Sequence, residues 1–223
     1  MTLTLAATHA GSHLRHAVCR AERRVWPYRY WLTAATLPEP MARRLARLDL
    51  DAPAIDDTRG KRETHNASRV FLSGTGRGAD GYEAGLAEAF QDDATVGLLA
   101  DITGRDLDGA FLRIEYCLDT DGFWLEPHTD IGAKLLTFLV YLTEDAAADD
   151  WGTDVMTADG LVVGRAPGGF GKGLIFAPAE DTWHGFTRRP IRGVRRSLII
   201  NYVKPEWRSR HELAFPDQPV RQA

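Results

Sequence analysis

The sequence predicts a mainly β fold with flanking helices (α+β), in which N-terminal helices buttress a double-stranded β-helix, or jelly-roll, core. The main observation is a change of pattern near residue 110. Beyond it, about eight short apolar runs recur at regular spacing and are separated by turn signals, a pattern typical of sandwiches and jelly rolls. Before it, apolar residues recur mainly at helical spacing. The apolar runs occupy residues 110–118, 123–128, 134–142, 153–156, 161–164, 173–177, 182–187 and 195–203.

The N-terminal half contains five segments with a readable pattern. Residues 1–25 are expected to form a loosely ordered or helical arm, and the aromatic run at 26–32 predicts a strand or a buried edge. Residues 38–48 predict a helix, because prolines stand at a plausible helix start and apolar residues follow at helical spacing. Residues 82–103 predict a longer helix. Between them, residues 69–72 predict a short strand.

No linker-like segment separates the two halves of the chain. We therefore expect one domain over residues 1–223, with residues 1–109 as helical support and residues 110–205 as the jelly-roll core.

The composition excludes several classes of function. Hydrophobic residues make up 44% and charged residues 26% of the 223 residues, which is ordinary for a soluble globular protein. A net charge of −4 gives no global basic field, so we expect no nucleic-acid partner and no anionic membrane partner. Cys19 and Cys117 can form one disulfide at most and cannot build a four-thiolate zinc site. Signal-peptide and membrane-span patterns are missing, which favours the cytoplasm.

The strongest chemical signal is a pair of metal-ligand types two residues apart. His128 and Asp130 are separated by one residue, which at the end of a strand places both side chains on one face. His184, fifty-six residues later, is the obvious third ligand. Two imidazoles and one carboxylate on one face of a metal leave positions open for co-substrate and oxygen, which is the arrangement of non-haem iron(II) oxygenases.

The surrounding motifs resemble the 2-oxoglutarate/iron(II) dioxygenase superfamily, particularly its prolyl-hydroxylase-like branch. The resemblance covers about the C-terminal half of the chain, in the family's order and at family-like spacings. The matching features are Gly122-x-x-Leu125-x-Pro127-His128-x-Asp130, the apolar strand Leu135–Leu142, Gly171-Lys172-Gly173-Leu174-Ile175-Phe176 leading into His184, and Gly193-Val194-Arg195-Arg196-Ser197-Leu198.

The resemblance implies a jelly-roll enzyme that uses Fe(II), 2-oxoglutarate and O₂, with His128, Asp130 and His184 as metal ligands. Arg195 is then expected to pair with the far carboxylate of 2-oxoglutarate, helped by Ser197 on the same strand face. Other arginines could bind this carboxylate instead. Arg196 is one, although it is otherwise expected to be a solvent-facing charge, and the loop arginines at 188, 189 and 192 are the others.

Three further residues carry open alternatives. Tyr116, on the strand before the metal motif, is expected either to contact the co-substrate or to pack in the core. His65 and Arg69 precede the catalytic half and are expected either to contact substrate or to lie in an exposed loop. Halogenating members of the family carry a small residue at the position of Asp130, so its carboxylate favours hydroxylation.

The expected reaction is hydroxylation of an unactivated C–H bond of a small molecule, an amino acid or natural-product intermediate, with release of succinate and CO₂. Alternatives are a sugar or nucleotide-sugar hydroxylase of the same class, or a cupin-like metal enzyme that does not use 2-oxoglutarate. A homodimer is left open.

Overall fold

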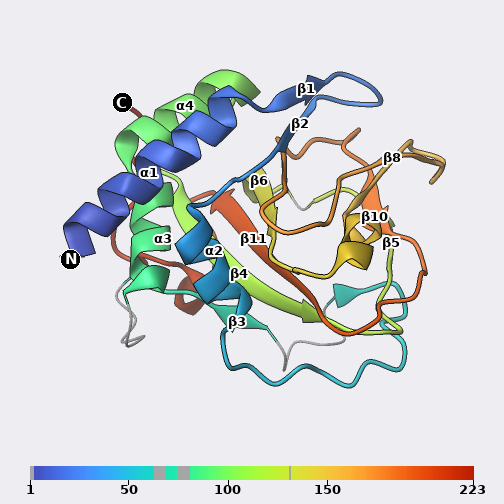
Figure 1. The fold of residues 1–223 in the computed structure, drawn as a ribbon. Coiled ribbons are helices and arrows are strands. Elements are labelled where there is room, and N and C mark those ends of the chain that lie inside the picture. The colour runs from blue at the N-terminus through green and yellow to red at the C-terminus, as the bar shows by residue number, and fades with distance from the viewer. Residues whose placement is uncertain (1–2, 63–68, 75–80, 131) are drawn as a thin grey trace.

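The computed structural model describes residues 3–62, 69–74, 81–130 and 132–223, with side chains from residue 9 onward. Helices cover one side of the molecule and the β-core forms the other (Figure 1). None of the described helices is long and apolar enough to cross a membrane. The helical elements are α1 (Leu3–Cys19), α2 (Glu39–Ala46), α3 (Tyr82–Gln91) and α4 (Asp93–Thr103), with the 3-10 turns η2 (Ala146–Trp151) and η3 (Arg210–Glu212).

The strands form two antiparallel sheets, and each expected run after residue 110 corresponds to one strand. The larger sheet has the order β1-β2-β9-β6-β11-β4-β3, and the smaller one has the order β5-β10-β7-β8. The jelly-roll expectation is thereby confirmed. The strand bounds are β1 (Glu22–Arg24), β2 (Tyr30–Thr33), β3 (Val70–Phe71), β4 (Phe111–Asp119), β5 (Leu125–His128), β6 (Lys134–Tyr141), β7 (Asp154–Met156), β8 (Val162–Arg165), β9 (Gly173–Phe176), β10 (His184–Phe186) and β11 (Arg195–Val203).

The larger sheet separates the helices from the interior of the jelly roll. On β11, Leu198, Ile200 and Tyr202 are fully buried and belong to the main core cluster, together with the helical residues Leu14 and Phe90. Successive strand residues point to opposite faces, so the residues between them face the interior of the jelly roll. The interior is therefore lined by the odd-numbered residues of β11.

The helical layer decides one open alternative and differs from the expectation in one place. The N-terminal arm is a helix, and its residues Ala10, Leu14 and Val18 are buried against the core. The helix expected over 82–103 is broken at Asp92, which adopts an extended conformation and caps α4 by accepting a hydrogen bond from the Thr95 amide at 3.0 Å. Aspartate is a favoured N-cap because its carboxylate satisfies a free amide of the first turn, and this local preference ends α3.

Residues 53–62, which we call the strap, belong to the cyan segment along the bottom of Figure 1 and turn at Arg59-Gly60, where both φ angles are positive. The Gly60 carbonyl accepts a hydrogen bond from the Glu126 amide, and the Thr120 hydroxyl donates to the Pro53 carbonyl. At Gly122, φ is +91°, and a Cβ atom would lie 2.5 Å from the Asp56 carbonyl oxygen. Only glycine allows the strap to approach this turn so closely.

Candidate metal centre and cavity

The three residues expected to bind metal come together. Potential ligand atoms of His128, Asp130 and His184 all lie within 4.8 Å of one another. Antiparallel pairing of β5 with β10 sets His184 directly opposite His128, with ring centroids 4.4 Å apart. Asp130 follows β5 after one intervening residue, so two strand ends supply the whole set.

Hydrogen bonds orient both imidazoles toward the shared position. Nδ1 of His128 lies 2.7 Å from the Glu126 carbonyl oxygen, and Nδ1 of His184 lies 2.8 Å from the Thr182 carbonyl oxygen. A carbonyl oxygen only accepts, so Nδ1 carries the proton in each ring. Nε2 is then left with a free lone pair, which is the usual arrangement of metal-binding histidines.

The electrostatics of the three groups suit a divalent cation. Burial lowers the pKa of His184 to about 4, so this imidazole is neutral at pH 7. Burial acts to raise the pKa of Asp130, but the Lys134 ammonium, His184 and the Thr137 hydroxyl outweigh it and hold the pKa well below its ordinary value. Metal ligands must be deprotonated, and the neutral His184 imidazole and the Asp130 carboxylate meet that condition. This donor set fits iron(II) and leaves coordination positions open.

A cavity of about 450 Å³ contains this cluster and extends along the interior face of the larger sheet. Arg195 lines it, and so does Arg113, which lies six residues from the partner of Arg195 along β4. At about 3.4 Å per residue the two positions are about 20 Å apart along the strands. The metal cluster lies between them. Asp130 accepts a hydrogen bond from Thr137, which is at the level of Arg113 in the sheet, and Phe186, two residues after His184, has its ring 5.0 Å from the Arg195 guanidinium carbon.

Arg195 and Ser197 both face the cavity side, as the period of two predicts. The Arg195 side chain is buried, with Nε donating to the Trp151 carbonyl at 2.5 Å and Nη1 donating to Asp119. The Ser197 hydroxyl is fully buried and has no hydrogen-bond partner among the described residues. A buried hydroxyl without a partner is costly, so this position fits an absent polar ligand.

Arg196 and Tyr116 lie on the other face of the sheet. The Tyr116 hydroxyl donates to the Leu45 carbonyl of α2 at 2.8 Å, and its ring is fully buried among the helical core residues. A co-substrate contact by Tyr116 is therefore inconsistent with the structure, and the packing alternative describes it. Arg196 interacts with this hydroxyl and is half-buried rather than solvent-facing.

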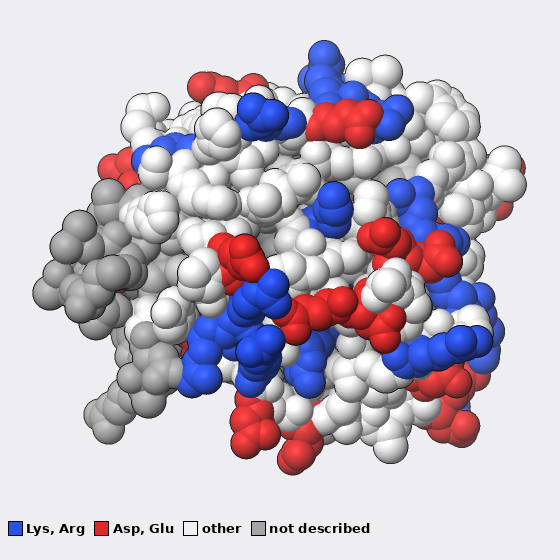
Figure 2. All heavy atoms as spheres, in the orientation of Figure 1, with Lys and Arg blue, Asp and Glu red and all other residues white. Residues whose placement is uncertain are grey.

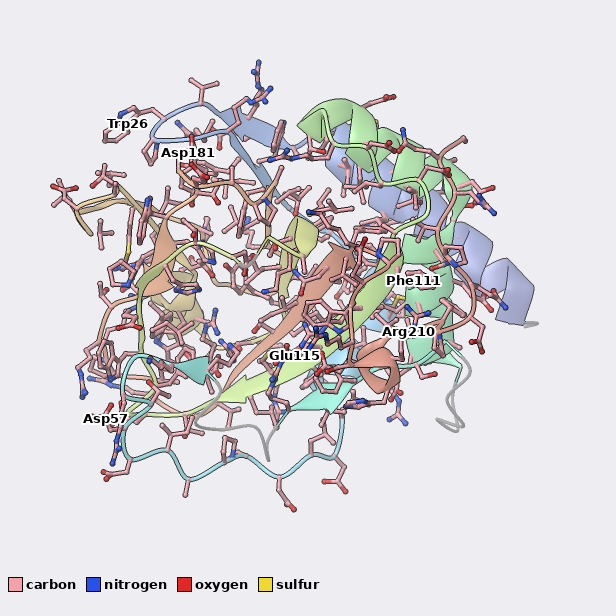
Figure 3. All side chains as sticks on the ribbon, turned by 180° about the vertical axis from the view of Figure 1, so that it is seen from behind. Trp26, Asp57, Phe111, Glu115, Asp181 and Arg210 are labelled. Atoms are coloured by element: carbon pink, nitrogen blue, oxygen red, sulfur yellow. The ribbon has the colours of Figure 1, made fainter. Side chains whose placement is uncertain are left out.

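Several charged residues of the cavity were not singled out from the sequence. Arg113, Glu115 and Asp119 alternate along β4 on the interior face, and all three are buried. In Figure 3, Glu115 lies on the middle of β4, between the strap that carries Asp57 and the C-terminal segment that carries Arg210. Charged residues at three of the four interior-facing positions 113, 115, 117 and 119, with Cys117 as the exception, are the signal that could have identified this row.

The segment before β3 supplies part of the cavity wall as well. Arg69 lines the cavity and makes two hydrogen bonds to Glu115, from Nε at 2.7 Å and from Nη2 at 3.0 Å. The substrate-contacting alternative for Arg69 thus remains a prediction with a suitable location. His65 lies outside the described residues.

Charges of both signs are interspersed on the face of the molecule drawn in Figure 2, without a broad single-sign patch. This distribution gives no basic footprint on that face of the kind that nucleic-acid-binding proteins use.

Comparisons with known proteins identify the fold. No family model matches the sequence, and no curated protein matches it. Solved structures match over most of the chain. A Trichoplax adhaerens prolyl hydroxylase, in complex with a hypoxia inducible factor oxygen degradation domain peptide fragment, aligns with a TM-score of 0.56 and 14% identity over 91% of this chain and 92% of its own.

Two other prolyl hydroxylases agree with this result. The Pseudomonas putida prolyl-4-hydroxylase has a TM-score of 0.53 and 16% identity, covering 89% of this chain and 91% of its own. The viral collagen prolyl hydroxylase of Paramecium Bursaria Chlorella virus-1 has a TM-score of 0.50 and 13% identity, covering 78% and 90% respectively. The chain therefore shares the jelly-roll fold of these prolyl hydroxylases.

Proposed function

We propose that this protein is a 2-oxoglutarate-dependent, non-haem iron(II) oxygenase that hydroxylates an unactivated C–H bond of a small molecule and releases succinate and CO₂. One observation carries the proposal. A single cavity joins the cluster of His128, Asp130 and His184 to the buried guanidinium of Arg195. A metal site alone fits many enzymes, whereas a metal site connected to a buried cation fits a co-substrate with a chelating end and a distal carboxylate.

Each group then has a defined task. His128, Asp130 and His184 would hold the iron, and Arg195 would bind the distal carboxylate of 2-oxoglutarate. Among the described residues, Nη2 of Arg195 has no hydrogen-bond partner and is available to donate. The Ser197 hydroxyl would complete that contact. Iron, 2-oxoglutarate and O₂ together supply the oxidising chemistry, and the protein contributes geometry and exclusion of water.

The other end of the cavity supports a small polar substrate. Its walls include a buried ion-pair cluster of Arg69, Arg113, Glu115 and Glu212, and Glu115 and Arg113 are each only 2% exposed. Such walls suit a molecule with its own charged or polar groups, because an apolar ligand would remove water from these charges and offer them no hydrogen bonds. A free amino acid or natural-product intermediate is the class we propose. A sugar or nucleotide sugar is the second candidate on the same argument.

A turnover assay tests the proposal. Protein reconstituted anaerobically with iron(II) would be mixed with 2-oxoglutarate and oxygen, and succinate would be measured across free amino acids, natural-product intermediates, nucleotide sugars and proline-containing peptides. We expect succinate formation to rise with a small polar molecule, and hydroxylated product to appear in equal amount. Stimulation by peptides alone would contradict the small-molecule substrate. Metal binding without any 2-oxoglutarate consumption would favour a cupin-like enzyme.

A further inference from the structure

Three polar residues on neighbouring strands form a straight row across the larger sheet. Thr137 on β6 lies directly opposite Asn201 on β11, and Asn201 lies directly opposite Arg113 on β4. All three face the interior and are nearly inaccessible, with exposed fractions of 3%, 0% and 2%. Buried polar groups in such a position need partners, and here they use one another.

The hydrogen bonds in this row all run in the same direction. Arg113 Nη1 donates to Asn201 Oδ1 at 3.0 Å, and Asn201 Nδ2 donates to Thr137 Oγ1 at 2.9 Å. The Thr137 hydroxyl then donates its only proton to Asp130 Oδ2 at 2.7 Å. The chain starts at a group that is always charged and ends on the carboxylate of the expected metal ligand, so each donor polarises the next.

Arg113, at the outer end of the row, is held in place by two further hydrogen bonds. Arg113 donates from Nη2 to Glu115 at 2.7 Å and from Nε to Glu212 at 2.6 Å. These contacts occupy all three nitrogens of the guanidinium, which fixes its plane. Asn201 is thereby held with its carbonyl toward Arg113 and its amide toward Thr137, and it cannot turn over without losing both contacts.

We propose that Thr137, Asn201 and Arg113 form a relay that positions the Asp130 carboxylate for metal binding. The inference rests on the proposed metal centre and adds three positioning residues that are not metal ligands. Lys134 holds the other carboxylate oxygen, Oδ1, at 2.6 Å. With both oxygens held, the carboxylate plane is set before the metal arrives, and the ordering cost of binding falls.

The relay differs from simple packing of buried polar groups in a measurable way. If Asn201 acts on the metal through Thr137, then its removal matters only while the Thr137 hydroxyl is present. If Asn201 serves only to stabilise the sheet, its removal changes folding stability and leaves metal affinity unchanged. A double-mutant cycle on metal affinity separates the two cases.

The test measures anaerobic binding of Co(II), an oxygen-stable probe, by calorimetry and by the visible Co(II) spectrum. The variants are Thr137→Val, Asn201→Leu and the double variant, with Thr137→Ser as the conservative change that keeps the hydroxyl. Thr103→Val is the matched control, because Thr103 is also buried and donates its hydroxyl to a backbone carbonyl, that of Leu99, far from the cluster. Circular dichroism confirms that each variant is folded.

We expect Thr137→Val to weaken Co(II) binding by about 10- to 100-fold, the usual effect of removing a group that orients a metal ligand. Asn201→Leu should weaken it by about tenfold in the wild-type background and less than twofold in the Thr137→Val background. Thr137→Ser and Thr103→Val should bind Co(II) as the wild type does. If Asn201→Leu does not fold, the contrast between Thr137→Val and Thr137→Ser still tests the final step of the relay.

Two results would overturn the inference, and they differ from each other. Wild-type affinity in Asn201→Leu, or equal losses in both backgrounds, would remove the relay while leaving the metal centre in place. A wild-type protein that binds no Co(II) would overturn the metal centre itself, and the relay with it.

Discussion

Asp119 and Arg195 lie directly opposite each other on β4 and β11, and their side chains form an ion pair inside the jelly roll, each side chain less than 5% exposed. The second oxygen of Asp119 accepts a hydrogen bond from Arg62 of the strap at 3.0 Å. One carboxylate therefore holds two guanidinium groups. The expected co-substrate anchor is joined through it to the strap.

Asp119→Asn should destabilise the fold strongly. Removing one partner of a buried pair leaves uncompensated charge, which costs about 3–5 kcal/mol, and here two arginines lose the same partner. Urea unfolding at pH 7 measures the free energy of unfolding. The control is Asp150→Asn, which removes an 84% exposed partner of Arg165 and should cost less than about 1 kcal/mol. Equal effects of the two substitutions would mean that Asp119 is not a buried ion-pair partner.

The two neighbouring arginines of β11 should differ sharply in their effect on 2-oxoglutarate. Arg195→Ala should raise the 2-oxoglutarate concentration required for turnover by tenfold or more, because truncating one partner of a buried charge pair costs about 2–5 kcal/mol. Arg196→Ala should change it little, since Arg196 lies on the helical face of the sheet. Succinate release as a function of 2-oxoglutarate concentration measures both. A reversed order would mean that the strand register is shifted by one residue.

Stability in acid should depend on Glu115. Burial acts to raise the pKa of this carboxyl, but hydrogen bonds from Arg69 and the charges of Arg113 and Arg62 outweigh it and lower the pKa from 4.5 to about 2. A pKa lowered by folding stabilises the protein above pH 4.5, and the contribution is lost as the pH falls toward 2. Its size is on the order of 3 kcal/mol.

Urea unfolding of the wild type and of Glu115→Gln between pH 7 and pH 2.5 measures this contribution. The variant should be less stable at pH 7, because its arginines lose a charged partner, and the difference between the two proteins should narrow below pH 4.5. A difference that stays constant over this range would show that folding does not lower the pKa of Glu115.

Either histidine of the cluster should be essential for metal binding. His128→Ala or His184→Ala leaves two ligands, which hold iron(II) weakly, so both metal binding and turnover should be lost. His211→Ala, at an exposed histidine outside the cluster, should retain both. Metal content after anaerobic reconstitution and succinate release are the two measurements. Wild-type-like metal content in either cluster variant would remove that residue from the assignment.

Much of this fold was predictable because strand alternation and turn signals are local properties of the sequence. The metal cluster could be predicted for the same reason, since His128 and Asp130 adjoin one strand and His184 begins another. The break at Asp92 was missed because one capping side chain outweighed a continuous apolar pattern. Boundaries between adjacent helices depend on such single contacts.

The charged partners of the cavity were harder to predict because they depend on pairing between distant segments. Asp119 meets Arg195 across 76 residues, and Thr137 meets Asn201 across 64. Alternation along β4 shows which residues share a face, but the strand that lies beside it and the register of pairing come only from the assembled sheet. For Tyr116 the sequence left a co-substrate contact and core packing open, and the assembled structure decides for packing, because the hydroxyl donates to the Leu45 carbonyl of α2.

The last prediction concerns the reaction type. Asp130→Gly removes an anionic ligand, opens a coordination position and leaves Lys134 and Thr137 without the carboxylate they contact. This resembles the arrangement of the halogenating members of the fold family, where a halide takes the vacant position. Hydroxylation should fall steeply, because the metal is held by two ligands only.

Chlorination also requires the substrate carbon to lie nearer the halide than the hydroxyl, and one substitution seldom achieves this. We therefore expect a nearly inactive enzyme with at most traces of chlorinated product, measured by mass spectrometry with and without chloride. Hydroxylation by Asp130→Gly at the native rate would show that Asp130 is not a ligand, and the metal centre would then have to be assigned anew.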